Sequence, residues 1–156
     1  MEKPATGTAY SAVVQKQRDY FWSHVTKPIE FRKTQLRKLK AAFAKHEDSL
    51  LAALKADLNK PKQEAFTTEL GITVAEIDHY IRHLEDWMEP ERVPTPLFFQ
   101  PGTSMIMPEP FGVTLIIAPW NYPVKNLFGP LLGAMAAGNT AVVKPSEISP
   151  NCSRAI

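Results

Sequence analysis

The chain has 156 residues, a formal net charge of +2, 44% hydrophobic residues and 22% charged residues. This length suits one domain, and the balance of apolar and charged residues argues against disorder along the whole chain. So small a net charge gives no electrostatic basis for binding nucleic acid or an anionic membrane.

Cys152 is the sole cysteine, so the chain has no internal disulfide, and no set of zinc ligands is visible in the sequence. Residues 1–7 lack the apolar segment of a secretory signal. The longest apolar stretch, residues 112–120, is far shorter than the roughly 20 residues of a membrane helix. We therefore expect a cytoplasmic protein with no metal site and no membrane span.

Three helices are predicted within residues 1–89. Apolar residues at helical spacing predict one over residues 9–25 and a second that begins near Pro28 and ends before Asn59. The third has the clearest pattern, and Pro90 ends it. Its apolar positions, in steps of three and four, are Phe66, Leu70, Val74, Ile77, Ile81, Leu84 and Met88.

Residues 90–110 form a separate segment that contains six prolines. Two short apolar runs, Leu97–Phe99 and residues 105–107, lie on either side of Pro101 and Gly102. This pattern predicts a hairpin or an extended arm, although the prolines limit hydrogen bonding between strands.

A strand–helix–strand unit follows in residues 111–156. Residues 112–118 are a nearly continuous apolar run, which predicts a strand buried on both faces of a parallel sheet. Asn121 is placed to cap the next helix and Gly138 to end it. A second buried strand is predicted at residues 140–143, and a further helix begins at Ser149.

Two parallel strands cannot cover their own faces, and such strands normally occur within a larger sheet covered by helices. We therefore expect an α/β fold in which N-terminal helices precede part of a parallel, Rossmann-like sheet. On these grounds residues 111–156 are interpreted as the truncated start of that sheet.

The loop after the first strand is the first candidate site. Its sequence, IIAPWNYP, occupies residues 116–123 at the carboxyl end of the strand, where open α/β sheets bind ligands. Asn121 offers amide donors on a backbone restrained by Pro119 and Pro123, and a rigidly held donor is what an oxyanion site needs. The local pattern alone favours the helix cap for Asn121, and the two roles are compatible.

The second candidate site, residues 143–147, follows the next strand at the same edge. Lys144 and Glu147 together could hold a ribose diol, with the carboxylate accepting from the hydroxyls. Taken alone, an ordinary ion pair in a loop is the stronger interpretation. No G-x-G-x-x-G follows the first strand, so a standard Rossmann phosphate loop is not supported.

Together these motifs resemble a known family. The segments PEPFGVTLIIAPWNYP and GPLLGAMAAGNTAVVKPSE are similar to the aldehyde dehydrogenase superfamily. The tract that contains NKPKQEAFTTELG and LEDWMEP resembles its class 3 branch, which is dimeric and acts on fatty or aromatic aldehydes. The resemblance covers nearly the whole chain, and PWNYP followed by GNTAVVKPSE is a specific pairing.

The resemblance implies an NAD(P)-dependent enzyme that oxidises aldehydes to carboxylic acids. Residues 1–89 would then be the helical N-terminal part of its cofactor domain. Asn121 would donate its amide to the substrate oxyanion, and Lys144 and Glu147 would contact the adenosine ribose of NAD, with NADP also accepted. The cofactor-binding residues that the resemblance implies are Ile117, Ala118, Pro119, Trp120, Lys144, Pro145, Ser146 and Glu147.

In the family a cysteine thiolate attacks the aldehyde and a glutamate activates water. The resemblance implies that both residues lie beyond position 156, that this chain is an inactive N-terminal fragment, and that the whole enzyme is a homodimer. Cys152 is predicted to lie in the first turn of a helix, where a thiolate is favoured. Because its neighbours do not match the family's nucleophile segment, we interpret Cys152 as a packing residue.

Two alternatives remain open on the sequence. One is an acyl-phosphate or acyl-CoA reductase of the same superfamily, and the other is a catalytically inactive, stand-alone binding module. The basic residues of the second helix are expected to form a solvated face, and His79 and His83 to be ordinary helix residues without a metal. Those basic residues are Lys33, Arg37, Lys40 and Lys45.

Overall fold

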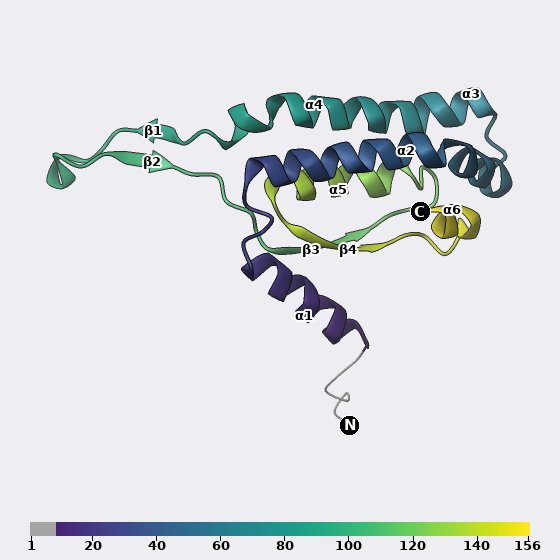
Figure 1. Ribbon diagram of the computed structural model, residues 1–156, viewed down its shortest axis with the longest axis horizontal. Helices are drawn as coiled ribbons and strands as arrows, with labels where there is room; N and C mark the ends of the chain where they lie inside the picture. The colour runs from purple at the N-terminus through teal and green to yellow at the C-terminus, as the bar shows by residue number, and fades with distance from the viewer. Residues whose placement is uncertain (1–8) are drawn as a thin grey trace.

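The computed structural model describes residues 9–156 and has an α/β fold (Figure 1). The expectation about a leader in residues 1–7 lies outside this range. Helix α5 (Lys125–Ala137) packs between a layer of long helices and a two-stranded parallel sheet, and helix α1 (Ala9–Trp22) lies on the other side of the sheet. The predicted fold class, helices followed by part of a parallel sheet, is confirmed.

The three predicted helices are present, with shifted ends. The first, α1, ends at Trp22 rather than at residue 25, because His24 has a positive φ of 60° that breaks the helix. The second, α2 (Ile29–Leu58), ends where Asn59 takes the left-handed conformation with φ 55°. Pro28, expected in the first turn of this helix, lies one residue before it at the N-cap position, in an extended conformation.

The third helix contains a wide turn that the periodic pattern does not show. It begins as α3 (Lys62–Ala65), passes through the π-helical turn η1 (Phe66–Leu70) and continues as α4 (Gly71–Met88). A π turn inserts an extra residue, so positions on either side of it change faces. Phe66, expected on the packed face, is therefore exposed, and Ala65 lies in the core instead. Glu69, within the turn, is fully buried.

The proline-rich segment forms a hairpin that projects from the body of the protein (Figure 1). Strand β1 (Glu91–Val93) pairs antiparallel with β2 (Ser104–Ile106). Leu97–Phe99, expected as one arm of the hairpin, instead forms the 3-10 turn η2 near its tip. Prolines at positions 94 and 96 lack the amide hydrogens that a strand there would need.

Strands β3 (Val113–Ile117) and β4 (Thr140–Lys144) form the parallel sheet, in register from Val113 opposite Thr140 to Ile117 opposite Lys144. The crossover helix α5 ends at Gly138, whose φ is 87°. A Cβ at Gly138 would lie 2.8 Å from the guanidinium of Arg32, so this position requires glycine for space as well as for backbone conformation.

The prediction that the first strand is buried on both faces is wrong for the described residues. Ile116 faces α5 and is buried, but Leu115 is 65% exposed and Ile117 is 68% exposed. Helix α1 reaches the opposite face near Gly112 and Thr140, at the start of the strands, and leaves their carboxyl ends uncovered.

The core lies between α5 and the helical layer. Its fully buried side chains come from α2, α4 and α5 and include Leu36, Leu54, Ile77 and Leu132. Helix α6 (Pro150–Ala155) follows the second strand and adds Cys152 to this core. Within residues 9–156 no helix is both long and apolar enough to cross a membrane.

Candidate active site at the carboxyl edge of the sheet

Two loops meet at the carboxyl ends of β3 and β4. The amide of Ala118 donates to the carbonyl of Lys144 at 3.0 Å, which continues the strand pairing one step beyond Ile117. The loop that carries Asn121 and the loop that carries Lys144 and Glu147 therefore leave the sheet side by side, and the exposed Asn121 lies on the first of them.

The residues expected to bind a cofactor differ in accessibility. Ile117 and Trp120 are exposed, as is Pro119, whereas Ala118 is buried beneath them. In the second loop Lys144 and Glu147 are exposed and Pro145 is half-buried. This edge thus presents apolar surface beside one loop and a pair of opposite charges on the other.

Ser146 is turned into its own loop. It is buried, and its Oγ accepts a hydrogen bond from the amide of Ile148 at 3.2 Å. Its carbonyl accepts from the hydroxyl of Ser153 at 2.6 Å. The side chain of Ser146 therefore stabilises the conformation of this loop and is largely closed to solvent.

Lys144 and Glu147 form an ion pair with each other. The hydrogen bond from Lys144 holds the pKa of the Glu147 carboxyl below its usual range, so the carboxylate is ionised at neutral pH. Because both side chains are exposed, solvent screens their attraction and the pair can open to a ligand.

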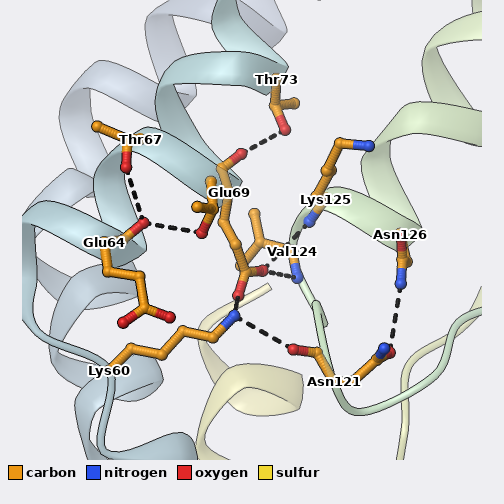
Figure 2. A network of polar contacts seen from close by, with 10 residues as sticks. Lys60, Glu64, Thr67, Glu69, Thr73, Asn121, Val124, Lys125 and Asn126 are labelled. Carbon is orange, nitrogen blue, oxygen red and sulfur yellow. Dashed lines mark hydrogen bonds and ion pairs between the residues drawn. The ribbon is translucent and has the colours of Figure 1, made fainter.

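The interpretation of Asn121 as the cap of the next helix is wrong. Helix α5 begins at Lys125, and no side chain at its N-cap position, Val124, caps it. The amides of Val124 and Lys125 donate instead to one carboxylate oxygen of Glu69, at 2.9 and 3.4 Å (Figure 2). A charged acceptor from the helical layer has taken the place that a local cap would fill.

The side chain of Asn121 is available for another role. Its Oδ1 accepts from the Nδ2 of Asn126 at 3.4 Å. Its own Nδ2 donates to no acceptor within residues 9–156. Because the residue is exposed and its acceptor oxygen is partnered by Asn126, Asn121 has a free hydrogen-bond donor at the edge of the sheet.

A buried ion pair beneath this loop was not foreseen from the sequence. Glu69 is fully buried and Lys60 is 9% exposed, and the two side chains form an ion pair. The Nζ of Lys60 also donates to the carbonyl of Asn121 at 3.2 Å and lies 3.9 Å from the ring centroid of Tyr122. These contacts connect the loop to the helical layer (Figure 2).

Cys152 is fully buried in the core. Burial, reinforced by the neighbouring Asp57 carboxylate, raises the pKa of its thiol to about 12. The expectation that the helix terminus would favour a thiolate is therefore wrong, because Asp57 accepts the hydrogen bond from the Cys152 amide at 2.8 Å and places a negative charge there. This arrangement supports the interpretation of Cys152 as a packing residue.

Other chemistry-bearing side chains have structural partners. Lys33 pairs with Glu85 at 2.5 Å and Lys40 with Asp78 at 2.7 Å, which ties α2 to α4. His79 makes edge-on and tilted ring contacts with Tyr80, His83 and Trp87 of α4. Over residues 9–156 no group of three or more His, Cys, Asp or Glu side chains is arranged to hold a metal ion.

Comparison with known proteins gives consistent matches over this chain. The model of the aldehyde dehydrogenase family matches residues 3–156. A 4,4'-diaponeurosporen-aldehyde dehydrogenase of Staphylococcus aureus is 49% identical over 137 residues, which are 88% of this chain and 30% of that protein. The family 3 aldehyde dehydrogenase comG of Dictyostelium discoideum is 41% identical over 155 residues, or 99% of this chain and 33% of that protein.

Solved structures agree with these matches. A substrate-bound Staphylococcus aureus AldH superposes with a TM-score of 0.92 at 44% identity, covering 96% of this chain and 32% of that one. The chain thus spans about a third of the length of the curated relatives that it matches.

Proposed function

Because the chain belongs to the aldehyde dehydrogenase family, we propose that it supplies the oxyanion donor and part of the cofactor site of an NAD(P)-dependent enzyme that oxidises aldehydes to carboxylic acids. The observation that carries the proposal is the meeting of two loops at one sheet edge, one with an exposed amide donor and one with a Lys–Glu pair. The relatives of this chain are aldehyde dehydrogenases, so the two alternatives, a reductase of acyl phosphates or acyl-CoA and a stand-alone binding module, are not favoured.

Asn121 is the proposed catalytic residue of this chain. Attack on an aldehyde carbonyl turns its oxygen into an oxyanion, and a donor fixed in advance stabilises that charge. Asn121 is an exposed residue, and its backbone carbonyl is held by Lys60. A fixed backbone with an accessible side-chain donor is the arrangement that this role requires.

The cofactor proposal rests on the chemistry of the second loop. The ionised Glu147 carboxylate can accept hydrogen bonds from the two hydroxyls of a ribose, and Lys144 lies beside it as a donor. Ile117 and Trp120 offer apolar surface for the nicotinamide side. The bound dinucleotide would supply the acceptor of the aldehyde hydride. NAD is the proposed cofactor, with NADP accepted less well, because Glu147 would repel a 2′-phosphate.

The missing phosphate loop is consistent with this site. In many dinucleotide-binding folds the amides at the N-terminus of the first crossover helix hold the pyrophosphate. In this protein the corresponding amides of Val124 and Lys125 donate to the Glu69 carboxylate, which would also repel a phosphate. The pyrophosphate is therefore proposed to lie away from the start of α5.

A chimera tests the proposal. The segment of the Staphylococcus aureus relative that matches this chain would be replaced by residues 1–156, and the purified chimera assayed for aldehyde-dependent reduction of NAD and NADP. We expect turnover, with the unmodified relative as the positive control. A folded chimera that binds neither cofactor and oxidises no aldehyde, fatty or aromatic, would contradict the proposal.

Three further properties are proposed: the first from the family resemblance, the second from its class 3 branch, and the third from the sequence itself, as expected above. The nucleophilic cysteine and the general base come from outside these 156 residues, the whole enzyme is a homodimer, and it works in the cytoplasm. The buried position of Cys152 supports the first of these. Sedimentation of the active enzyme and cell fractionation would test the other two.

A further inference from the structure

We propose that the Lys60–Glu69 ion pair positions the Asn121 loop, so that the two residues determine where the Asn121 amide is presented. This inference rests on the proposed role of Asn121 as an oxyanion donor. Neither residue touches the exposed edge where a substrate would lie, so both would act through the loop.

The Glu69 carboxylate joins three parts of the fold. Its Oε1 pairs with Lys60, which precedes α3, and its Oε2 accepts from the amides of Val124 and Lys125 at the start of α5. The carboxylate itself belongs to the π turn η1. A carboxylate taken fully out of water needs such donors, and here it has three.

Two fixed points bracket the Asn121 side chain. On one side Lys60 holds the Asn121 carbonyl at 3.2 Å, and on the other Glu69 holds the amide of Val124 at 2.9 Å. Between them the ring of Tyr122 lies under the Lys60 ammonium at 3.9 Å. The backbone from Asn121 to Val124 therefore has little freedom to rotate, although its outer surface is exposed.

Glu69 lies in the π turn, on the face that α4 buries. Thr73, one regular turn further along, is also fully buried, and the wide turn places Ala65 rather than Phe66 in the core. Nearby threonines bond to backbone carbonyls in and just before this turn: Thr67 to Glu64 at 3.2 Å, and the buried Thr73 to Glu69 at 2.5 Å (Figure 2). A local distortion with its own hydrogen bonds is typical of functional sites in helices.

A buried ion pair is weak grounds for stability, because apolar residues of similar volume often stabilise a protein as well or better. Precise placement is a different matter, since a misplacement of about 1 Å at a reacting centre can cost about 100-fold in rate. The contacts of Lys60 and Glu69 therefore point to geometry rather than to stability as their main contribution.

Hydrogen exchange in the chain of 156 residues tests the positioning directly. We would compare Glu69→Gln and Lys60→Met with the matched controls Asp78→Asn and Lys40→Met, which break an ion pair between α2 and α4. In Glu69→Gln the Val124 and Lys125 amides should exchange about tenfold faster or more, relative to the Ala118 amide at the same edge. Lys60→Met should shift the NMR signals of the Asn121 side-chain amide.

Three outcomes would overturn the inference. They are unchanged loop amides in both variants, an equal rise in exchange at every amide including Ala118, and loss of folding in both variants while the controls fold. The last two would make the pair a general determinant of the fold and not of the loop.

A double-mutant cycle in the active chimera then tests the link to Asn121. Glu69→Gln should lower kcat about tenfold or more with little change in the KM for NAD, and this loss should largely disappear in an Asn121→Ala background. Equal losses in both backgrounds would overturn the inference. A chimera without turnover would contradict the proposed function instead, and the exchange experiment would then decide the positioning role.

Discussion

Asn121 is the residue on which the proposed chemistry depends most. Loss of one oxyanion donor lowers turnover by roughly 100- to 1,000-fold in other enzymes, so Asn121→Ala in the chimera should lower kcat by about that factor. The KM for NAD should change little, because the ribose loop is not altered. Gln15→Ala, which removes an exposed amide on α1, is the matched control. Near-normal kcat in Asn121→Ala would show that its amide does not contact the oxyanion.

Glu147 should govern the choice between NAD and NADP. Its ionised carboxylate accepts from ribose hydroxyls and repels a 2′-phosphate, so Glu147→Gln should shift the ratio of kcat/KM for NAD over NADP toward NADP by roughly tenfold. Glu109→Gln, an exposed carboxylate outside the two loops, serves as the control. An unchanged ratio, measured at neutral pH with one aldehyde, would place the ribose elsewhere.

Cys152 should be unreactive in the folded chain. With the pKa of its thiol near 12, about one thiol in 10,000 is ionised at pH 8, and the side chain is fully buried. A thiol reagent should therefore modify Cys152 only after denaturant is added. Cys152→Ser should leave the turnover of the chimera within a small factor. Rapid modification without denaturant, or a variant that folds but is inactive, would contradict this.

The raised pKa of the Cys152 thiol predicts that the folded state loses stability at high pH. Well below pH 9 the thiol is protonated in both the folded and unfolded states, so it makes no difference to the balance between them. As the pH rises from about 9 toward about 12, the unfolded thiol ionises first, and stability falls. Cys152→Ser should lack this component in urea titrations repeated across that range.

Carboxylates from the helical layer cap the N-termini of α5 and α6, the two helices that follow the parallel strands β3 and β4. Glu69 does so for α5, and Asp57 accepts from the Cys152 amide at 2.8 Å and the Asn151 side chain at 2.6 Å at the start of α6. Such long-range caps satisfy amides at the helix N-termini and also fix the helical layer against the sheet. Because Glu69 caps α5, the side chain of Asn121 is not needed as a cap.

Asp57→Ala should therefore destabilise the protein. Loss of a cap costs about 1 kcal/mol, which for this size of domain lowers Tm by roughly 3 °C. Burial opposes ionisation of Asp57, but the hydrogen bonds from Cys152 and Asn151 together hold its pKa below the usual value. Its contribution is thus present above about pH 4 and is lost as the pH falls. Asp48→Ala, on an exposed part of α2, should leave Tm unchanged in thermal melts.

The helices, the two parallel strands and their shared edge could be predicted because their signals are local. Apolar spacing identified α2 and α4, and β-branched runs between Gly and Pro identified β3 and β4. The π turn could not be predicted in this way, since Phe66 and Leu70 fit a regular helix. The hairpin partner of β2 was missed because Glu91–Val93 carries charged residues and little apolar pattern.

The residues of the candidate site also differ in whether a local pattern could predict them. Asn121, Lys144 and Glu147 follow predicted strands, so topology alone brought them to one edge. Lys60 and Glu69 are 61 and 55 positions from the loop groups that they bind, and no short-range pattern links them. The sequence offered one signal for Glu69, a Glu next to the apolar stripe of an amphipathic helix. A Glu at a solvated surface position gives the same pattern.

Packing is uneven across the protein. The helical layer and α5 enclose a continuous core, whereas the far face of β3 and the hairpin tip expose large apolar side chains. Leu115 and Ile117 on the strand are 65% and 68% exposed, and Phe98 at the tip is 97% exposed. Exposed apolar strands promote association between chains.

We therefore expect residues 1–156 alone to show no aldehyde dehydrogenase activity, weak cofactor binding and a tendency to self-associate. The chain has one thiol, which is buried and protonated, so it offers no thiolate for covalent attack. The helices should still form, because their contacts are largely local, and circular dichroism should show a helical spectrum with a broad thermal transition. NAD and NADP reduction would be assayed with short, long and aromatic aldehydes, alongside cofactor titration and sedimentation.

Variants that make the exposed apolar surface polar separate the causes of association. Ile117→Thr on the strand and Phe98→Ser at the hairpin tip should each reduce self-association in sedimentation if the surface that they alter drives it. Tyr10→Ser, an exposed aromatic on α1, is the control. Robust turnover by these 156 residues would show that the chain needs no nucleophile from outside it. A sharply melting monomer that binds NAD tightly would show that its exposed strand needs no cover.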